Sequence, residues 1–244
     1  MDELSLPLLY RDDHYVAIHK PPHLLVHRTH LARDEVFVLQ RLRDQLKRRL
    51  YPIHRLDRAT SGVLVFGLTP EAAHRLVEQF ADHLVEKEYW ALSRGWVADT
   101  GTIDHPVRDD DTDKPPRDAV THYRCLARGE LPFAVDRYPT ARYSWVRADP
   151  KTGRRQQIRR HFKHISHHLI GDVKHGNGKH NRFFRQHFGI QRLMLLAKRL
   201  AFTHPMTGAY TVLTTAPEGE WQRVAAALGW DLASPFPRPN CGDR

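Results

Sequence analysis

Short apolar runs separated by turn residues predict strands in the first third of the chain. Residues 8–10 and 15–18 flank an acidic turn and stop at Lys20-Pro21, a pattern that predicts a β-hairpin. The uninterrupted apolar run at 63–67 is typical of a buried strand, and another strand is predicted over 86–94.

Apolar residues at helical spacing predict two helices in the same region. Four leucines share one stripe of an otherwise basic segment: Leu39, Leu42, Leu46 and Leu50. This stripe predicts a basic amphipathic helix leading toward residues 54–62. Thr69 and Pro70 form the N-cap and first-turn pair of a second helix, in which Leu76, Val77 and Phe80 are expected to face inward.

The second half mixes strand-like runs with helical segments. Strands are predicted at 120–126, 133–138, 143–148, 193–196, 200–202 and 210–215. Helices are predicted at 155–164 and around Trp221, Val224 and Leu228, whereas 109–116 and the polar segment 175–187 are predicted loops, the latter mobile. This mixture, without an internal repeat, predicts an α+β fold. We expect one domain over 1–234 and a frayed tail over 235–244.

The composition of the chain predicts a polyanionic partner. The 244 residues carry 38 Lys and Arg against 28 Asp and Glu, a net charge of +10, and the pI is about 9.9. A pI above about 9 suggests a nucleic-acid partner. Cys125 and Cys241 are too few for a disulfide framework or a zinc knuckle, so a cytoplasmic location is expected. No signal peptide and no membrane span are expected, because no apolar stretch approaches about 18 residues.

Candidate chemistry lies first in residues 54–62, where the single carboxylate of Asp57 is surrounded by His54, Arg55 and Arg58. Nearby cations keep a carboxylate ionised, and Gly62 at the junction with a strand permits close approach of backbone to a ligand. The alternative is an ordinary surface ion pair between Asp57 and one of the arginines.

A second candidate is the basic run 151–164, which holds six Lys or Arg residues and no acid. Such a run indicates phosphate contact, although a basic helix face can also be merely solvated.

Both strings resemble signatures of the RluA-type pseudouridine synthases. Residues 54–62 read His-Arg-Leu-Asp-Arg-Ala-Thr-Ser-Gly, similar to the family's His-Arg-Leu-Asp-x-x-Thr-Ser-Gly. Residues 151–159 read Lys-Thr-Gly-Arg-Arg-Gln-Gln-Ile-Arg, similar to Lys-Thr-Gly-Arg-x-His-Gln-Ile-Arg, and Lys87-Glu88-Tyr89 resembles the family's Lys-x-Tyr. The resemblance implies a single pseudouridine-synthase domain with a mixed, mostly antiparallel sheet, flanking helices and a central RNA-binding cleft.

The resemblance also implies roles for individual residues. Asp57 is the expected catalytic residue, Arg159 the basic residue that pairs with it, and Tyr89 the ring that stacks on the target base and takes part in proton removal. Arg55 is expected to fill the stack that a flipped base vacates. Residues of both strings are expected to contact RNA: His54, Arg55, Arg58, Lys151, Arg154, Arg155, Arg160 and Lys163.

The likeness to members that form pseudouridine 65 in tRNA implies tRNA as the partner, with ribosomal RNA as the alternative. It rests on residues 139–143 and on Lys174-His175-Gly176.

The chain departs from the family pattern at Gln156 and Leu196, where His is usual. Because Asp57 comes so early, we expect no separate N-terminal RNA-binding module, and we expect a monomer. The isomerisation itself requires neither a cofactor nor a metal.

Two rival classes of function remain open at this point. The 18 histidines, among them His161, His164 and His168 at helical spacing, admit a metal-dependent hydrolase, but no His-Glu-x-x-His occurs and no carboxylate completes the group. A non-catalytic RNA-binding module accounts for the charge and leaves the Asp57 string unexplained.

Overall fold

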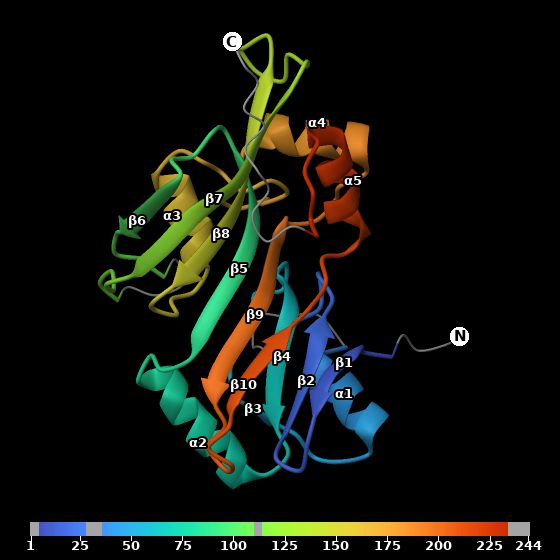
Figure 1. Cartoon of the computed structure of the whole chain (residues 1–244), viewed down its shortest axis with the longest axis vertical. Coiled ribbons are helices and arrows are strands. Elements are labelled where there is room, and N and C mark those ends of the chain that lie inside the picture. The colour runs from blue at the N-terminus through green and yellow to red at the C-terminus, as the bar shows by residue number, and fades with distance from the viewer. Residues whose placement is uncertain (1–4, 28–35, 110–113, 234–244) are drawn as a thin grey trace. The chain divides into compact units, whose positions relative to one another are not determined.

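The computed structural model describes residues 5–27, 36–109 and 114–233, and it combines a mostly antiparallel sheet with helices (Figure 1). This confirms the α+β class. The chain divides into two compact units, the first formed by Met1–Glu88 and Leu196–Ala216, the second by Tyr89–Leu195 and Pro217–Arg244. The expectation of one catalytic domain stays a prediction, and the expected tail lies outside the described residues.

The first unit is built on the predicted hairpin. Its strands are β1 (Leu8–Arg11), β2 (Tyr15–Lys20), β3 (Tyr51–Pro52), β4 (Ser61–Gly67), β10 (Tyr210–Thr214) and all but the first residue of β9 (Leu195–Thr203). β2 pairs antiparallel with both β1 and β4, and β4 pairs parallel with β9. Instead of two short strands at 193–196 and 200–202, the structure has one strand, β9, which begins at Leu195 and continues to Thr203.

Two helices belong to this unit, α1 (Val38–Leu46) and α2 (Pro70–Ala81). α1 ends one turn earlier than the leucine stripe predicts, because Lys47 adopts a left-handed conformation with φ 54°. The predicted cap of α2 is confirmed, since the Thr69 hydroxyl accepts a hydrogen bond from the amide of Ala72 at 3.2 Å.

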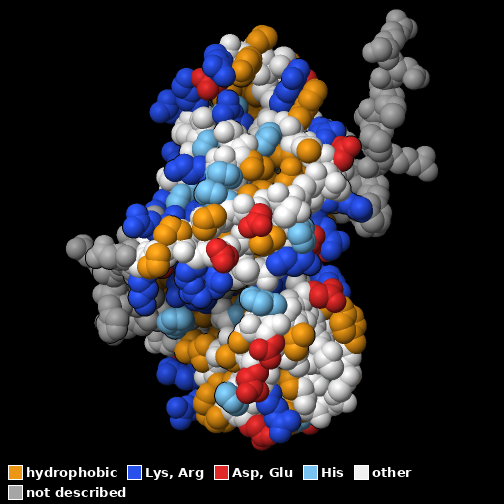
Figure 2. All heavy atoms as spheres, turned by 90° about the vertical axis from the view of Figure 1, so that its left-hand side faces the viewer, with side chains coloured by type: hydrophobic (Ala, Val, Ile, Leu, Met, Phe, Trp, Pro, Cys, Tyr) orange, Lys and Arg blue, Asp and Glu red, His pale blue; other side chains and the backbone are white. Residues whose placement is uncertain are grey.

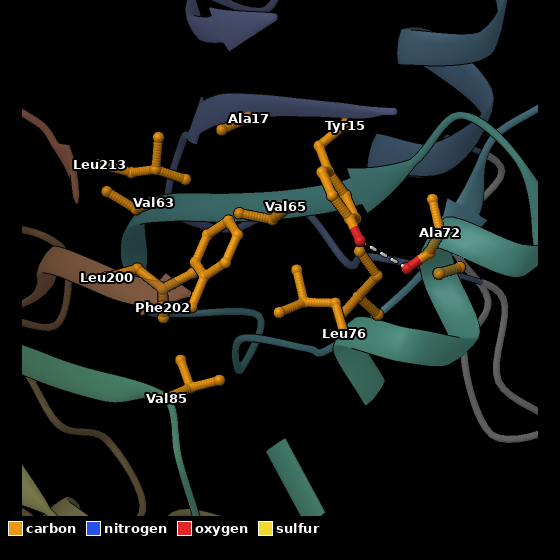
Figure 3. Packing of buried hydrophobic residues seen from close by; sticks show 12 residues of the cluster. Tyr15, Ala17, Val63, Val65, Ala72, Leu76, Val85, Leu200, Phe202 and Leu213 are labelled. Atoms are coloured by element: carbon orange, nitrogen blue, oxygen red, sulfur yellow. Dashed lines mark hydrogen bonds between the residues drawn. The ribbon is translucent and has the colours of Figure 1, made fainter. Parts of the chain in front are cut away.

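The core of the first unit lies between α2 and the strands (Figure 3). Tyr15, Leu76 and Phe202 are buried there, and the Tyr15 hydroxyl donates a hydrogen bond to the carbonyl of Ala72 at 2.8 Å. The prediction that Val77 faces inward is wrong: it is 39% exposed, because one step of about 100° from buried Leu76 turns it to solvent.

The second unit contains an antiparallel sheet of β5 (Glu86–Arg94), β8 (Ala141–Pro150), β7 (Val120–Leu131) and β6 (Thr100–Asp104), in that order. The first three residues of β5 still belong to the first unit. The strand predicted at 133–138 is wrong. β7 and β8 remain paired up to Leu131 and Ala141, so the residues between them must form the connecting turn.

Three helices belong to the second unit: α3 (Gln157–His164), α4 (Gly178–Phe188) and α5 (Gly219–Leu228). α3 begins two residues later than predicted, and α5 confirms the closing helix. The mobile loop predicted over 175–187 is wrong, because most of this segment is α4. The Asn177 side chain caps that helix, and Phe183 and Phe184 bury one face of it. Among the described residues, no helix is long and apolar enough to span a membrane.

Candidate active site

Asp57 opens a tight turn whose exit is fixed by packing. The amide of Thr60 donates a hydrogen bond to the carbonyl of Asp57 at 3.1 Å, and the Asp57 side chain is half-buried. The chain then enters β4 through Gly62, whose φ is +115° and whose missing Cβ would lie 2.3 Å from the carbonyl oxygen of Ala197. Only glycine fits this position, so the sheet holds the end of the Asp57 turn in place.

A buried lysine supports the same turn through hydrogen bonds to backbone carbonyls. Lys20 is fully buried at the end of β2, opposite Gly62 of β4. Its ammonium group donates hydrogen bonds to the carbonyl oxygens of Pro21 at 2.7 Å, Leu24 at 2.7 Å and Arg58 at 3.2 Å. Lys20 therefore ties the segment after the hairpin to the Asp57 turn, a role that sequence reasoning missed; a Lys ending a buried strand before two prolines was the available signal.

The three basic residues beside Asp57 differ in exposure. His54 Nε2 accepts a hydrogen bond from the amide of Val65 at 3.1 Å, and its ring stacks on Phe80 with centroids 4.8 Å apart. Burial, assisted by the charge of Lys87, lowers the pKa of His54 to about 3, so the ring is neutral and supports the loop. Arg55 and Arg58 are exposed. RNA contact by these three residues stays a prediction.

In the second unit, Arg159 on α3 forms a buried ion pair with Asp172. Its Nε and Nη2 donate to the two carboxylate oxygens at 2.7 and 2.8 Å, a bidentate geometry. The amides of Lys174 and His175 also donate to Asp172 Oδ1, both at 2.9 Å. Burial alone would raise the pKa of Asp172, but the hydrogen bonds and charge of Arg159 and the two amides hold it below the usual value.

The expected pairing of Arg159 with Asp57 joins residues of different units and stays a prediction. Tyr89, the third member of the expected set, is half-buried on β5, where it pairs with Ala148 of β8. It is also the first residue of the second unit.

Gln157 braces the loop that carries the second basic string. Its Oε1 accepts hydrogen bonds from the Thr152 hydroxyl at 2.7 Å and the Arg154 amide at 2.9 Å, and its Nε2 donates to the carbonyl of Val120. Lys151 is exposed, and the half-buried Arg154 donates through Nε to the carbonyl of Asp118. The bend before α3 therefore depends on one buried amide side chain.

The remaining cations of this string differ in partner and in exposure. Arg155 forms an ion pair with Asp109 at 2.8 Å, Arg160 is half-buried and Lys163 is exposed. Their contact with RNA, like that of Lys151 and Arg154, stays a prediction.

The histidines that suggested a metal site are engaged in other contacts. His161 is fully buried, with Nδ1 2.9 Å from the hydroxyl of Thr121 and Nε2 donating to the carbonyl of His105 at 2.9 Å. Within the described ranges, no group of three or more His, Cys, Asp or Glu residues is arranged to hold a metal ion.

The comparison with protein families decides between the classes of function. Residues 14–164 match the family described as RNA pseudouridylate synthase. The chain belongs to this family. As an RNA pseudouridylate synthase, the protein is an isomerase that acts on RNA.

Two relatives and one solved structure show how far the likeness extends. The chain is 46% identical over 235 residues to tRNA pseudouridine synthase C of Pectobacterium carotovorum subsp. carotovorum, covering 92% of this chain but 62% of that one. It is 43% identical over 235 residues to tRNA pseudouridine synthase C of Vibrio cholerae serotype O1, covering 92% and 96%. Human RNA Pseudouridylate Synthase Domain Containing 4 matches with a TM-score of 0.72 at 22% identity over 93% of this chain and 94% of that one, which shows a shared fold.

The two departures from the family signature have local explanations. Gln156 adopts a left-handed conformation with φ 56°, and its Oε1 accepts a hydrogen bond from His175 Nε2 at 2.7 Å. Leu196 is fully buried on β9, where it pairs with Ser61 of β4. Neither position bears a residue that the resemblance assigns to catalysis.

Proposed function

We propose that this RNA pseudouridylate synthase acts on tRNA, converting the uridine at position 65 to pseudouridine, with Asp57 as the catalytic residue. The observation that carries the proposal is the turn of Asp57, which is held by the hydrogen bond from Lys20 to the carbonyl of Arg58 and by the close packing of Gly62 where the chain enters β4. The relatives named tRNA pseudouridine synthase C, which match 92% or more of this chain, favour tRNA over ribosomal RNA.

The reaction breaks the bond between N1 of uracil and C1′ of ribose, rotates the uracil and joins C5 to C1′. The hydrogen on C5 leaves as a proton and N1 takes up a proton, so atoms and electrons balance without an oxidant or reductant. Asp57 acts as a nucleophile toward the sugar or the base, or removes a proton from the sugar. Each of these roles requires an ionised carboxylate.

The other residues serve access and positioning. A base inside a stem must be flipped out before it can react, and the exposed guanidinium of Arg55 is suited to fill the vacated stack. Tyr89 then holds the flipped ring, and Arg159 is the basic residue that pairs with the catalytic carboxylate. We further propose that the protein works as a monomer in the cytoplasm and uses no cofactor.

Release of tritium from tRNA labelled at C5 of uridine tests the reaction, because formation of the new bond expels this hydrogen. Wild-type protein should release label, whereas Asp57→Asn should still bind tRNA and release label at least about a hundredfold more slowly. Asp44→Asn is the matched control, since Asp44 is an exposed carboxylate of the same unit that pairs with Arg43. It should react like wild type.

The position is tested with a tRNA in which uridine 65 is replaced by cytidine. Wild-type protein should release no more label from this substrate than a reaction without enzyme does. Rapid label release by folded Asp57→Asn protein contradicts the catalytic assignment, and undiminished release from the altered tRNA contradicts position 65.

A further inference from the structure

A pocket of about 480 Å³ opens in the second unit, lined mostly by basic side chains. Arg108 contributes from the segment after β6, Arg160 and Lys163 from α3, and Lys174 from the segment before α4. None of the described residues that line the pocket is acidic. A concave surface lined by one sign of charge concentrates ligands of the opposite sign, so the pocket favours an anion.

One wall of the pocket is a rigid pair of aromatic rings. His105 and His164 stack with centroids 3.7 Å apart and an interplanar angle of 14°. Behind them, buried His161 fixes the backbone of His105 by donating to its carbonyl oxygen at 2.9 Å. Figure 2 views the molecule from the left-hand side of Figure 1, which is the side where α3 and β6 lie. On this face, His side chains lie beside Lys and Arg side chains. The stacked rings thus give the pocket a preformed shape with N–H donors at its edge.

Two of the cations have no competing partner within the described ranges. Arg108 and Lys163 are exposed, and no ion pair or side-chain hydrogen bond engages either of them in that part of the chain. Arg155, five residues before Arg160 and outside α3, contrasts with them because its guanidinium already pairs with Asp109. An incoming anion can therefore bind Arg108 and Lys163 without first displacing a partner among the described residues.

The pocket is joined to the Arg159 site by backbone hydrogen bonds. His175 and Lys174 line the pocket, and their amides donate to the carboxylate of Asp172, which holds Arg159 from the other side. A ligand in the pocket therefore lies one short segment of chain away from a residue that the proposed function places beside the target uridine.

We propose that this pocket binds one phosphate group of the RNA backbone, close in sequence to the target uridine. Arg and Lys are the side chains that best recognise phosphate oxygens, and phosphate contacts set the register of a protein on its nucleic acid. The proposal rests on the proposed function for the identity of the RNA, but not for the pocket itself. A free phosphate-bearing molecule shares the same chemistry, and the experiment below separates the two.

The test is a set of tRNAs, each with one backbone phosphate near uridine 65 replaced by an uncharged methylphosphonate. Wild-type protein should bind the RNA modified at one or two of these positions on the order of tenfold more weakly, the loss of one charge-assisted contact. Arg108→Ala/Lys163→Ala should bind unmodified RNA more weakly and show no further loss at those positions. The matched control Arg182→Ala/Arg185→Ala removes two exposed cations of α4 outside the pocket and should keep the full loss at those positions.

Identical loss patterns in wild type and Arg108→Ala/Lys163→Ala would overturn the proposal, as would the absence of any sensitive phosphate in wild type. In a second arm, inorganic phosphate is titrated against protein with labelled histidines and observed by NMR. Saturable shifts that disappear in the double variant, without coupling to any RNA phosphate, would assign the pocket to a free phosphate ligand and also overturn it. Binding is measured separately from tritium release, so failure of tRNA isomerisation leaves this result readable.

Discussion

The buried pair of Arg159 and Asp172 should be the most sensitive electrostatic contact of the second unit. Asp172 accepts two hydrogen bonds from the guanidinium and two from backbone amides. Asp172→Asn keeps the shape but removes the charge and turns one acceptor into a donor facing Arg159. Breaking a buried ion pair by changing one partner costs about 3–5 kcal/mol, so the free energy of unfolding should fall by that amount.

The pKa of Asp172 sets the pH at which this loss is measured. Its folded-state pKa is below the ordinary value of 3.8, so the stabilisation is fully present above the unfolded pKa. It disappears only as pH falls through the folded pKa. Urea denaturation at pH 7 therefore reports the full contribution.

A double-mutant cycle then identifies the cause. In Arg159→Met/Asp172→Asn no buried charge of the pair remains, and the amide oxygen can still accept from the amides of Lys174 and His175. The double variant should recover about 2 kcal/mol relative to Asp172→Asn alone. Asp109→Asn, which breaks the exposed pair with Arg155 at a similar distance, is the control and should cost less than about 1 kcal/mol. The reasoning is refuted if Asp172→Asn costs no more than this control, or if the two single losses simply add.

Two further outcomes follow from the Asp57 turn and its support. Gly62→Ala should lower the free energy of unfolding by more than about 2 kcal/mol, because the new Cβ would meet the carbonyl of Ala197 and φ is positive; Gly153→Ala, with nothing within 4 Å, should change it by less than about 0.5 kcal/mol in the same urea titration. Equal effects would show that the close approach to Ala197 is unimportant. The depressed pKa of His54, about 3 against 6.5 unfolded, means that the unfolded state binds the proton first, so stability falls as pH drops below about 6.5. Between pH 8 and pH 5 His54 contributes about 2 kcal/mol of this loss, and His54→Gln should show a correspondingly shallower decline; an unchanged slope would contradict a neutral His54.

Local signals in the sequence predicted local structure well. The cap of α2 follows from Thr69 and Pro70 alone, because its hydrogen bond spans three residues. α4 was missed because its many polar residues obscured the Phe183-Phe184 face, although the cap residue Asn177 stood immediately before it. The false strand at 133–138 has the composition of a strand, and only the pairing of Leu131 with Ala141 excludes it.

The residues of the candidate site were named by motif, whereas their partners depend on tertiary contacts. Asp172 accepts from Arg159 thirteen residues away, and Lys20 donates to Arg58 across thirty-eight. No periodicity or spacing in the chain encodes these contacts, since they arise when strands and helices pack.

The contact between Gln156 and His175 makes these two positions a single unit for protein engineering. Restoring the His that the family signature carries at 156 would place an imidazole against His175, where an amide oxygen now accepts a hydrogen bond. It would also keep a side chain with a Cβ in a left-handed conformation, which strains any residue but glycine by about 1 kcal/mol or more. A designer who moves this chain toward the family consensus must therefore change both positions together, and a score that treats substitutions as independent will misjudge each of them.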